Sequence, residues 1–307
     1  MGDPMLRYRT ALLAGLFLIL VFPVPGLAAD FARLHQNGLT VLYPPSLEAA
    51  AVEAVDLYPS VRKRLEESLR WRIDFQPTLI LIKDRRPFVQ MAGSDLFVAY
   101  AVPERDLMVI DYSKMRAHPF SIEVTMKHEL CHLLLHRHIE RKNLPKWLDE
   151  GVAQWVSGGL AEIITHRKGY ALKRATLTGR YLSWEALRGR FPKERDALIL
   201  AYEQSESLVA YIVTHFGLDG LNALLHHLQR GSHLDVAVAE ALFTSTDQLE
   251  AAWEADLGRG LTLFSMLINH LYEILFFLAA LLAVCGFVRY LMKKKAYDEP
   301  DDDVPLF

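Results

Sequence analysis

The first half of the chain carries short apolar runs of the kind that form strands. Residues 39–45 and 77–83 are nearly continuous apolar stretches that end at prolines or a charged residue, which is typical of buried strands. Residues 97–102 and 107–112 flank a four-residue turn sequence that begins at Pro103. The pattern therefore predicts four strands, the last two of them joined as a hairpin.

Helical periodicity governs most of the remaining chain. Apolar residues recur every three or four positions in residues 47–71 and again in residues 118–138. After Trp147 the pattern is mainly helical as far as Leu257, with interruptions at glycines such as Gly217. A half that mixes strands and helices thus precedes an all-helical half. This order predicts an α+β fold with two lobes and a cleft between them.

An apolar segment near the N-terminus has the features of a secretory signal. Two arginines precede residues 11–22, and prolines and small residues follow them. Twelve residues rise about 18 Å as a helix, too little for a hydrocarbon core of about 30 Å. We therefore predict a cleaved signal peptide at residues 1–29 and an exported domain at residues 30–265. An uncleaved anchor is the alternative, because Leu27 departs from the small-residue rule for cleavage.

A second apolar segment, residues 268–292, is long enough to cross a bilayer with modest tilt. Its apolar core, residues 274–288, is unbroken, and the lysines at 293–295 end it abruptly. Such a basic cluster belongs on the cytoplasmic side of a membrane. We therefore predict a transmembrane helix at residues 268–292 and a cytoplasmic tail at residues 293–307. A buried core helix is the alternative for this segment.

Composition narrows the class of protein further. The 307 residues are 51% hydrophobic and 23% charged, with a mean hydropathy of +0.12 that is high for a soluble protein. A net charge of −3 removes the electrostatic case for a nucleic-acid partner. The two cysteines, Cys131 and Cys285, exclude a disulfide scaffold, and the predicted topology keeps them apart. The chain also lacks any Asn-x-Ser/Thr acceptor. These features favour a bacterial inner-membrane protein with its main domain in the periplasm.

The candidate chemistry lies where the two halves meet. The sequence His-Glu-Leu-Cys-His runs from His128 to His132 inside a predicted helix. Residues four apart project side by side from a helix, so both imidazoles can bind one metal ion. Glu129 follows the first histidine directly and is placed to take a proton from a metal-bound water. Imidazole and carboxylate ligands with one open position predict a catalytic Zn²⁺ site.

Two residues compete as the third ligand. His138 lies ten residues after His128, which is metzincin spacing, but Leu135 stands where that family has its turn glycine. Glu150 lies eighteen residues after His132, close to gluzincin spacing. Pro145 allows a new helix to begin and to return Glu150 to the metal. We favour Glu150 as the third ligand.

These motifs resemble a known family. The His-Glu-Leu-Cys-His sequence, the Leu-Pro-Lys-Trp-Leu-Asp-Glu-Gly sequence of residues 144–151 and the Ala-Tyr-Glu-Gln-Ser sequence of residues 201–205 are similar to those of bacterial peptidase MA-like gluzincins. The resemblance covers roughly residues 80–260. It implies a thermolysin-like zincin fold, with a mixed N-terminal lobe, an all-helical C-terminal lobe and, in this chain, one added transmembrane helix.

The resemblance also implies roles for individual residues. His128, His132 and Glu150 would bind zinc, and Glu129 would be the general base. The strand at 107–112 would be the edge strand that borders the cleft and pairs with an extended peptide.

Two further residues have alternative interpretations. Tyr202 matches a recurrent tyrosine of the family and is a candidate catalytic donor to the oxyanion, although it could equally be a packed core residue. Gln154 could orient a ligand histidine or lie at the surface.

The predicted function is a zinc-dependent metallopeptidase in which Glu129 activates a zinc-bound water to cleave a peptide or protein substrate. One C-terminal helix would hold it in the lipid bilayer. The alternative is an inactive zinc-binding envelope module that binds peptides or assists assembly. An intramembrane protease is excluded, because His128 lies about 140 residues before the membrane segment.

Overall fold

The computed structural model describes residues 31–115, 120–158 and 169–297. The predicted signal peptide and the last ten residues of the predicted tail lie outside the described residues. The chain divides into two units, of which the first ends at Trp253. Because the strands and helices as far as Trp253 belong to that one compact unit, a division into thermolysin-like lobes stays a prediction.

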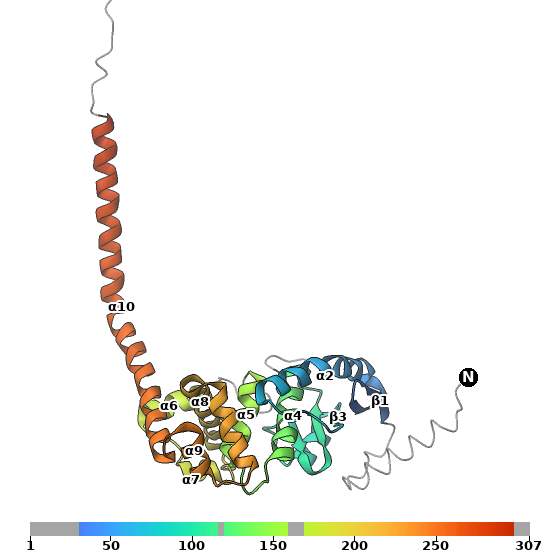
Figure 1. The fold of residues 1–307 in the computed structure, drawn as a ribbon. Helices are drawn as coiled ribbons and strands as arrows, with labels where there is room; N and C mark the ends of the chain where they lie inside the picture. Colours follow the sequence, from blue (N-terminus) through green and yellow to red (C-terminus); the bar gives the residue numbers. More distant parts are fainter. Residues whose placement is uncertain (1–30, 116–119, 159–168, 298–307) are drawn as a thin grey trace, which may run out of the picture. The chain divides into compact units, whose positions relative to one another are not determined.

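A single five-stranded sheet forms one side of the first unit (Figure 1). Its spatial order is β1-β2-β3-β5-β4. The three inner strands run parallel to one another, and the strand at each edge is antiparallel to its neighbour. The strands are β1 (Ala32–Gln36), β2 (Leu39–Tyr43), β3 (Thr78–Ile82), β4 (Ala99–Val102) and β5 (Leu107–Asp111).

The predicted hairpin of β4 and β5 is confirmed, but the predicted edge strand is wrong. β5 lies between β3 and β4, so β4 is the strand that forms the edge. All five residues of β5 are buried, whereas three of the four residues of β4 are partly exposed. The fully buried strand therefore lies inside the sheet, and the partly exposed strand of the hairpin is left at the edge.

Two elements escaped the sequence analysis. β1 exposes three of its five residues, so it lacks a strong apolar pattern. The short helix α3 (Arg85–Ala92) buries only Phe88 fully. Both are held by contacts with the sheet rather than by a periodicity of their own.

Helices α2 (Glu48–Leu69) and α4 (Ile122–His138) pack against the sheet and against each other (Figure 1). α2 presents a buried stripe of alanine, valine, leucine and tyrosine at helical spacing. α4 is buried over most of its length, including His128, Glu129 and His132. The helix that carries the candidate chemistry is therefore enclosed on several sides.

The all-helical half is confirmed over the described residues. α5 packs against α4 on one side and α8 on the other, and thereby connects the sheet-containing part to the other helices (Figure 1). α8 is interrupted at Gly217, whose φ of 72° is open to glycine and unfavourable for other residues. The helices are α5 (Lys146–Ser157), α6 (Tyr170–Thr178), α7 (Trp184–Arg188), α8 (Arg195–Gln229), α9 (Leu234–Leu242) and α10 (Thr246–Tyr297).

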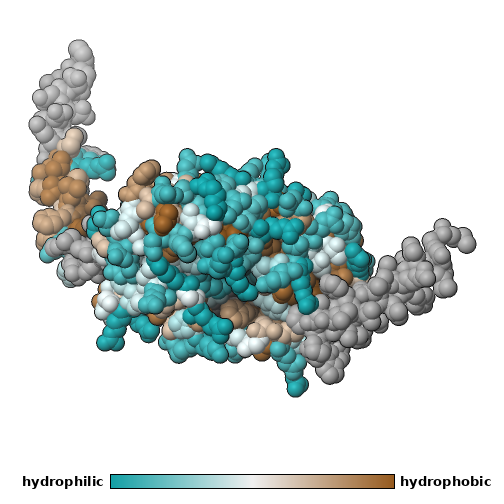
Figure 2. All heavy atoms as spheres, turned by 60° about the horizontal axis from the view of Figure 1, so that its bottom comes forward, coloured by the Kyte–Doolittle hydropathy of each residue, from teal (hydrophilic) through white to brown (hydrophobic). Residues whose placement is uncertain are grey.

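Among the described residues, two helices are long and apolar enough to cross a membrane. In α8 the apolar window is 44% buried, as expected for a core helix. The window Leu271–Lys294 of α10 has a higher mean hydropathy, 2.4, and is 0% buried. In Figure 2 apolar residues dominate this helix, whereas the face of the first unit in view is mostly hydrophilic. An apolar C-terminal helix is therefore present where the sequence predicts one.

Candidate metal centre

The first half of the centre is built into α4. Ser121 begins the helix, where its hydroxyl accepts a hydrogen bond from the backbone N–H of Val124. One turn of helix separates His128 from His132, and both side chains are buried. Their rings meet edge to face, with centroids 4.8 Å apart. The i, i+4 spacing alone thus brings the two imidazoles together.

The second half comes from α5, which begins directly after Pro145 as the sequence predicts. Trp147 is completely buried and packs against Trp184 of α7, with ring centroids 5.1 Å apart. At Gly151 a Cβ atom would collide with the Ser205 backbone of α8. α5 can therefore lie close to α8 only because residue 151 is a glycine.

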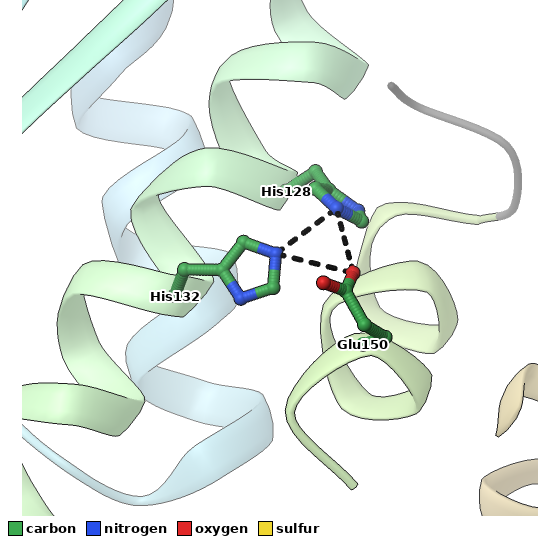
Figure 3. Close-up of side chains that lie close together, drawn as sticks. All are labelled: His128, His132 and Glu150. Atoms are coloured by element: carbon green, nitrogen blue, oxygen red, sulfur yellow. Dashed lines mark hydrogen bonds and ion pairs between the residues drawn. The ribbon is translucent and has the colours of Figure 1, made fainter. Parts of the chain in front are cut away.

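Figure 3 shows the side chains of His128, His132 and Glu150 pointing toward one another from these two helices. Nε2 of His132 lies 3.2 Å from Nε2 of His128. Oε2 of Glu150 lies 3.8 Å from His128 Nε2 and 3.5 Å from His132 Nε2. The three ligand atoms all lie within 4.8 Å of one another, and all three residues are buried.

These distances fit a tetrahedral zinc site. Two ligand atoms that each lie about 2.0–2.1 Å from zinc are about 3.3 Å apart in a tetrahedron. Glu150 Oε2 is also buried without a hydrogen-bond donor among the described residues. A buried carboxylate oxygen needs a positive partner, which a metal ion between the three atoms supplies.

A carboxylate that the sequence analysis missed orients His132. Oδ1 of Asp149 lies 2.6 Å from His132 Nδ1. Burial opposes ionisation of Asp149, but His132 and Lys146 outweigh it and hold its pKa well below the usual range. The ionised carboxylate can only accept, so His132 Nδ1 carries the donated proton, and Nε2 faces the other two candidate ligands, where a metal ion could replace its proton. Asp149 also accepts a hydrogen bond from His136 Nε2 at 3.2 Å.

The electrostatics of the centre favour a cation. Burial raises the pKa of Glu150, but Lys146 and His132 reverse this effect and lower it to about 2. Burial likewise lowers the pKa of His132, yet the charges of Asp149 and Glu150 raise it well above its ordinary value. Two buried carboxylates that stabilise positive charge on a ligand imidazole would do the same for a divalent ion.

A cavity of about 730 Å³ opens onto the centre. It is lined by residues of α3, α4, α5, the hairpin and the segment that joins α7 to α8. The predicted base Glu129 lies in its wall together with His132 and Glu150. The edge strand β4 contributes Ala99, Tyr100 and Ala101. A peptide in the cavity would therefore lie beside the candidate base, the ligands and the sheet edge.

Two tyrosines line the cavity from opposite walls. Tyr202 of α8 is buried and packs against Phe191, with ring centroids 5.4 Å apart. Tyr100 of β4, which the sequence analysis did not single out, has a buried hydroxyl without a hydrogen-bond partner among the described residues. Burial and the charge of Glu129 raise the pKa of Tyr100. Tyr100 is therefore a neutral hydroxyl donor at neutral pH.

The three residues that follow Tyr202 in the Ala-Tyr-Glu-Gln-Ser sequence make structural contacts. Both carboxylate oxygens of Glu203 accept backbone N–H groups at the start of α6, at 2.8 Å. Gln204 bonds the backbone of Leu182 in both directions. Ser205 supplies the backbone against which Gly151 packs. Glu203 and Gln204 thus connect α8 to α6 and to the segment before α7, whereas Ser205 contacts α5 next to Glu150.

The other candidate residues that the sequence suggested are not ligands in this centre. His138 stacks on Trp71, with ring centroids 4.5 Å apart, and is not among the residues that converge with His128 and His132. Gln154 is buried rather than at the surface, and its amide donates to the Tyr202 carbonyl at 3.5 Å. Its interpretation as a surface residue is therefore wrong, and Asp149 holds the ligand histidine instead. Cys131 is a free, buried cysteine.

Comparison with known proteins gives one family. Residues 117–258 match the model of the Peptidase MA superfamily. No curated protein matches the chain.

Three solved structures share a low similarity with the chain. Yeast LTA4 hydrolase bound to bestatin has 12% identity and a TM-score of 0.44 over 70% of this chain and 36% of that chain. A mutant M1 zinc metallopeptidase from Deinococcus radiodurans has 15% identity and a TM-score of 0.43, covering 72% and 50%. Native yeast LTA4 hydrolase has 13% identity and a TM-score of 0.44, covering 74% and 38%. This chain thus spans half or less of the length of each.

The family match includes both halves of the candidate centre, since α4 and α5 lie inside it. The resemblance inferred from the sequence is therefore confirmed over residues 117–258, which match the Peptidase MA superfamily.

Proposed function

We propose that this protein is a zinc-dependent metallopeptidase that hydrolyses peptide bonds. The observation that carries the proposal is the convergence of His128, His132 and Glu150, with ligand atoms within 4.8 Å of one another, beside a cavity that also contains Glu129. The match of residues 117–258 to the Peptidase MA superfamily supports the same conclusion.

The roles of the residues follow from their positions. His128, His132 and Glu150 would hold the zinc ion, and Asp149 would keep His132 in the correct tautomer. Bound zinc would lower the pKa of a water molecule and polarise the substrate carbonyl. Glu129 accepts the proton of the attacking water and then passes it to the leaving amine.

Tyr202 is the proposed donor to the oxyanion, because it lines the same cavity as Glu129 and its α8 neighbours hold it in place. Tyr202→Phe should lower kcat by about 10²–10³ with zinc content unchanged. Tyr100→Phe is the matched variant from the opposite wall. A larger loss of kcat in Tyr100→Phe would transfer the role to Tyr100.

We further propose that the protein is exported and held in the bacterial inner membrane by α10, with its first unit in the periplasm. The fully exposed apolar window Leu271–Lys294 and the lysines that follow its core support a membrane span with its C-terminal end in the cytoplasm. Protease added to intact spheroplasts should digest the first unit and spare a tag at the C-terminus. The reverse pattern would contradict this orientation.

The first experiment is a zinc measurement on the full-length protein in detergent, purified without added metal. We expect a zinc-to-protein ratio near one. Glu129→Gln should retain zinc and lose about 10²–10⁴ in turnover of any peptide that the wild type cleaves. A folded wild-type protein that neither contains nor accepts zinc would overturn the proposal.

The same pair of proteins tests the alternative function. An inactive zinc-binding module would contain zinc, and no peptide would be cleaved by either the wild type or Glu129→Gln. The location of Glu129 in the cavity wall, beside two of the three candidate ligands, favours the enzyme.

A further inference from the structure

The charged residues of the cavity wall are unevenly distributed. Its described lining contains three carboxylates, and all of them belong to the candidate centre, as Glu129, Asp149 and Glu150. The same lining contains four cations, which are Arg141, Lys146, Arg188 and Arg190. The part of the wall that a substrate would contact away from the centre is therefore positive.

Three of the four cations are already paired. Lys146 lies 2.5 Å from Glu150 and 3.3 Å from Asp149. Arg141 pairs with Glu104 at 3.1 Å. Arg188 pairs with Asp235 at 2.5 Å, and its guanidinium lies over the Trp184 ring. These contacts neutralise part of the charge of the three cations.

Arg190 differs from the other three. It is exposed, and it forms no ion pair with any residue in the described part of the chain. It also precedes Phe191, whose ring packs against Tyr202 in the same cavity. The guanidinium of Arg190 is thus available to a ligand beside the proposed catalytic tyrosine.

We propose that Arg190 binds a carboxylate of the peptide substrate and makes the enzyme prefer acidic peptides. This inference rests on the proposed peptidase function and names its substrate class. A guanidinium presents paired N–H donors that match the two oxygens of a carboxylate. The carboxylate belongs either to an acidic side chain or to the C-terminus of the peptide.

The surroundings of Arg190 indicate what accompanies the carboxylate. The cavity wall also contains Met91, Phe97 and Phe191, which are apolar. A substrate that matches this wall carries an apolar side chain near its negative charge. Purely basic peptides would be repelled by the same cations.

The test uses the zinc-loaded full-length protein in detergent and a library of proteome-derived peptides, with cleavage products identified by mass spectrometry. We expect glutamate or aspartate to be enriched near the cleavage sites. Matched blocked peptides that differ by Glu or Gln at the enriched position should differ about tenfold in kcat/KM. A second pair with a free or an amidated C-terminus distinguishes the two sources of the carboxylate.

Variants of Arg190 then assign the preference. Arg190→Ala should bring the Glu-to-Gln ratio of kcat/KM, or the acid-to-amide ratio, close to one. Arg190→Glu should favour a matched lysine peptide instead. Arg180→Ala is the control, because Arg180 is also exposed but does not line the cavity. It should retain the wild-type ratio, and zinc content and thermal unfolding of each variant verify its fold.

The outcomes separate the two proposals. If the zinc-loaded protein cleaves no peptide of the library, the proposed peptidase function fails. If it cleaves peptides without preference for a carboxylate, or if Arg190→Ala keeps the preference, the assignment of Arg190 is wrong while the peptidase function stands.

Discussion

Helices α4 and α5 both supply ligands to the candidate centre, but they position them by different means. In α4 the two histidines are four residues apart, and helix geometry alone brings their Nε2 atoms to 3.2 Å. In α5 the position of Glu150 depends on a neighbour, because Gly151 packs directly against the α8 backbone. Local helix geometry positions the α4 half of the centre, whereas tertiary contacts position the α5 half.

The comparison extends to charge. α4 contributes two imidazoles, and α5 contributes Asp149 and Glu150, which are both buried. Buried carboxylates are costly unless a positive group compensates them. The α5 half therefore depends on Lys146, on the α4 histidines and, in the proposed enzyme, on zinc. Substitutions of residues that pack against α5 should therefore disturb the centre even when they lie far from the ligands. Substitutions at a similar distance around α4 should disturb it less.

The largest effect is expected from removing the tertiary ligand. Glu150→Ala should weaken zinc binding by more than about a hundredfold. A hundredfold loss of affinity is the upper end for removing a residue that only hydrogen-bonds a metal ligand, and Glu150 would be a ligand itself. His138→Ala is the matched control, since His138 stacks on Trp71 outside the centre. Competition with a zinc chelator measures both affinities. If His138→Ala lost more zinc than Glu150→Ala, the third ligand would be His138.

A smaller loss is expected from the α5 residue that touches α4. Asp149→Asn keeps the shape of the side chain but removes the charge that fixes the His132 tautomer. Zinc affinity should fall by about 10–100-fold. Equilibrium dialysis against buffered zinc measures the change. An affinity equal to that of the wild type would mean that helix geometry alone positions His132.

The smallest effect on the centre is expected from a change that touches no ligand. Gly151→Ala adds a methyl group where the α8 backbone lies, which should destabilise the fold by about 1–3 kcal/mol. Gly258→Ala is the control, because a Cβ at Gly258 meets nothing within 4 Å. Chemical denaturation followed by fluorescence measures both. An equal stability of the two variants would show that α5 tolerates a shift away from α8.

Much of the fold could be read from local patterns. The apolar runs of β3 and β5, the helical periodicity of α2 and the start of α5 after Pro145 are all properties of neighbouring residues. β1 and α3 were missed, since their few buried residues are defined by contacts with the sheet. The edge position of β4 could not be predicted from its own sequence, because strand order depends on pairing between distant segments.

The sequence by itself determined the paired histidines, the position of the candidate base Glu129 beside them and the apolar character of residues 271–294, because each depends on spacing or composition within one segment. Only the tertiary structure decided that Glu150 joins His128 and His132, that Asp149 orients His132, and that Arg190 shares a cavity with Tyr202. Each of these arrangements joins residues from different segments of the chain, such as His132 of α4 and Asp149 of α5. Spacing within one helix cannot specify them, since they depend on how α4, α5 and α8 pack against one another.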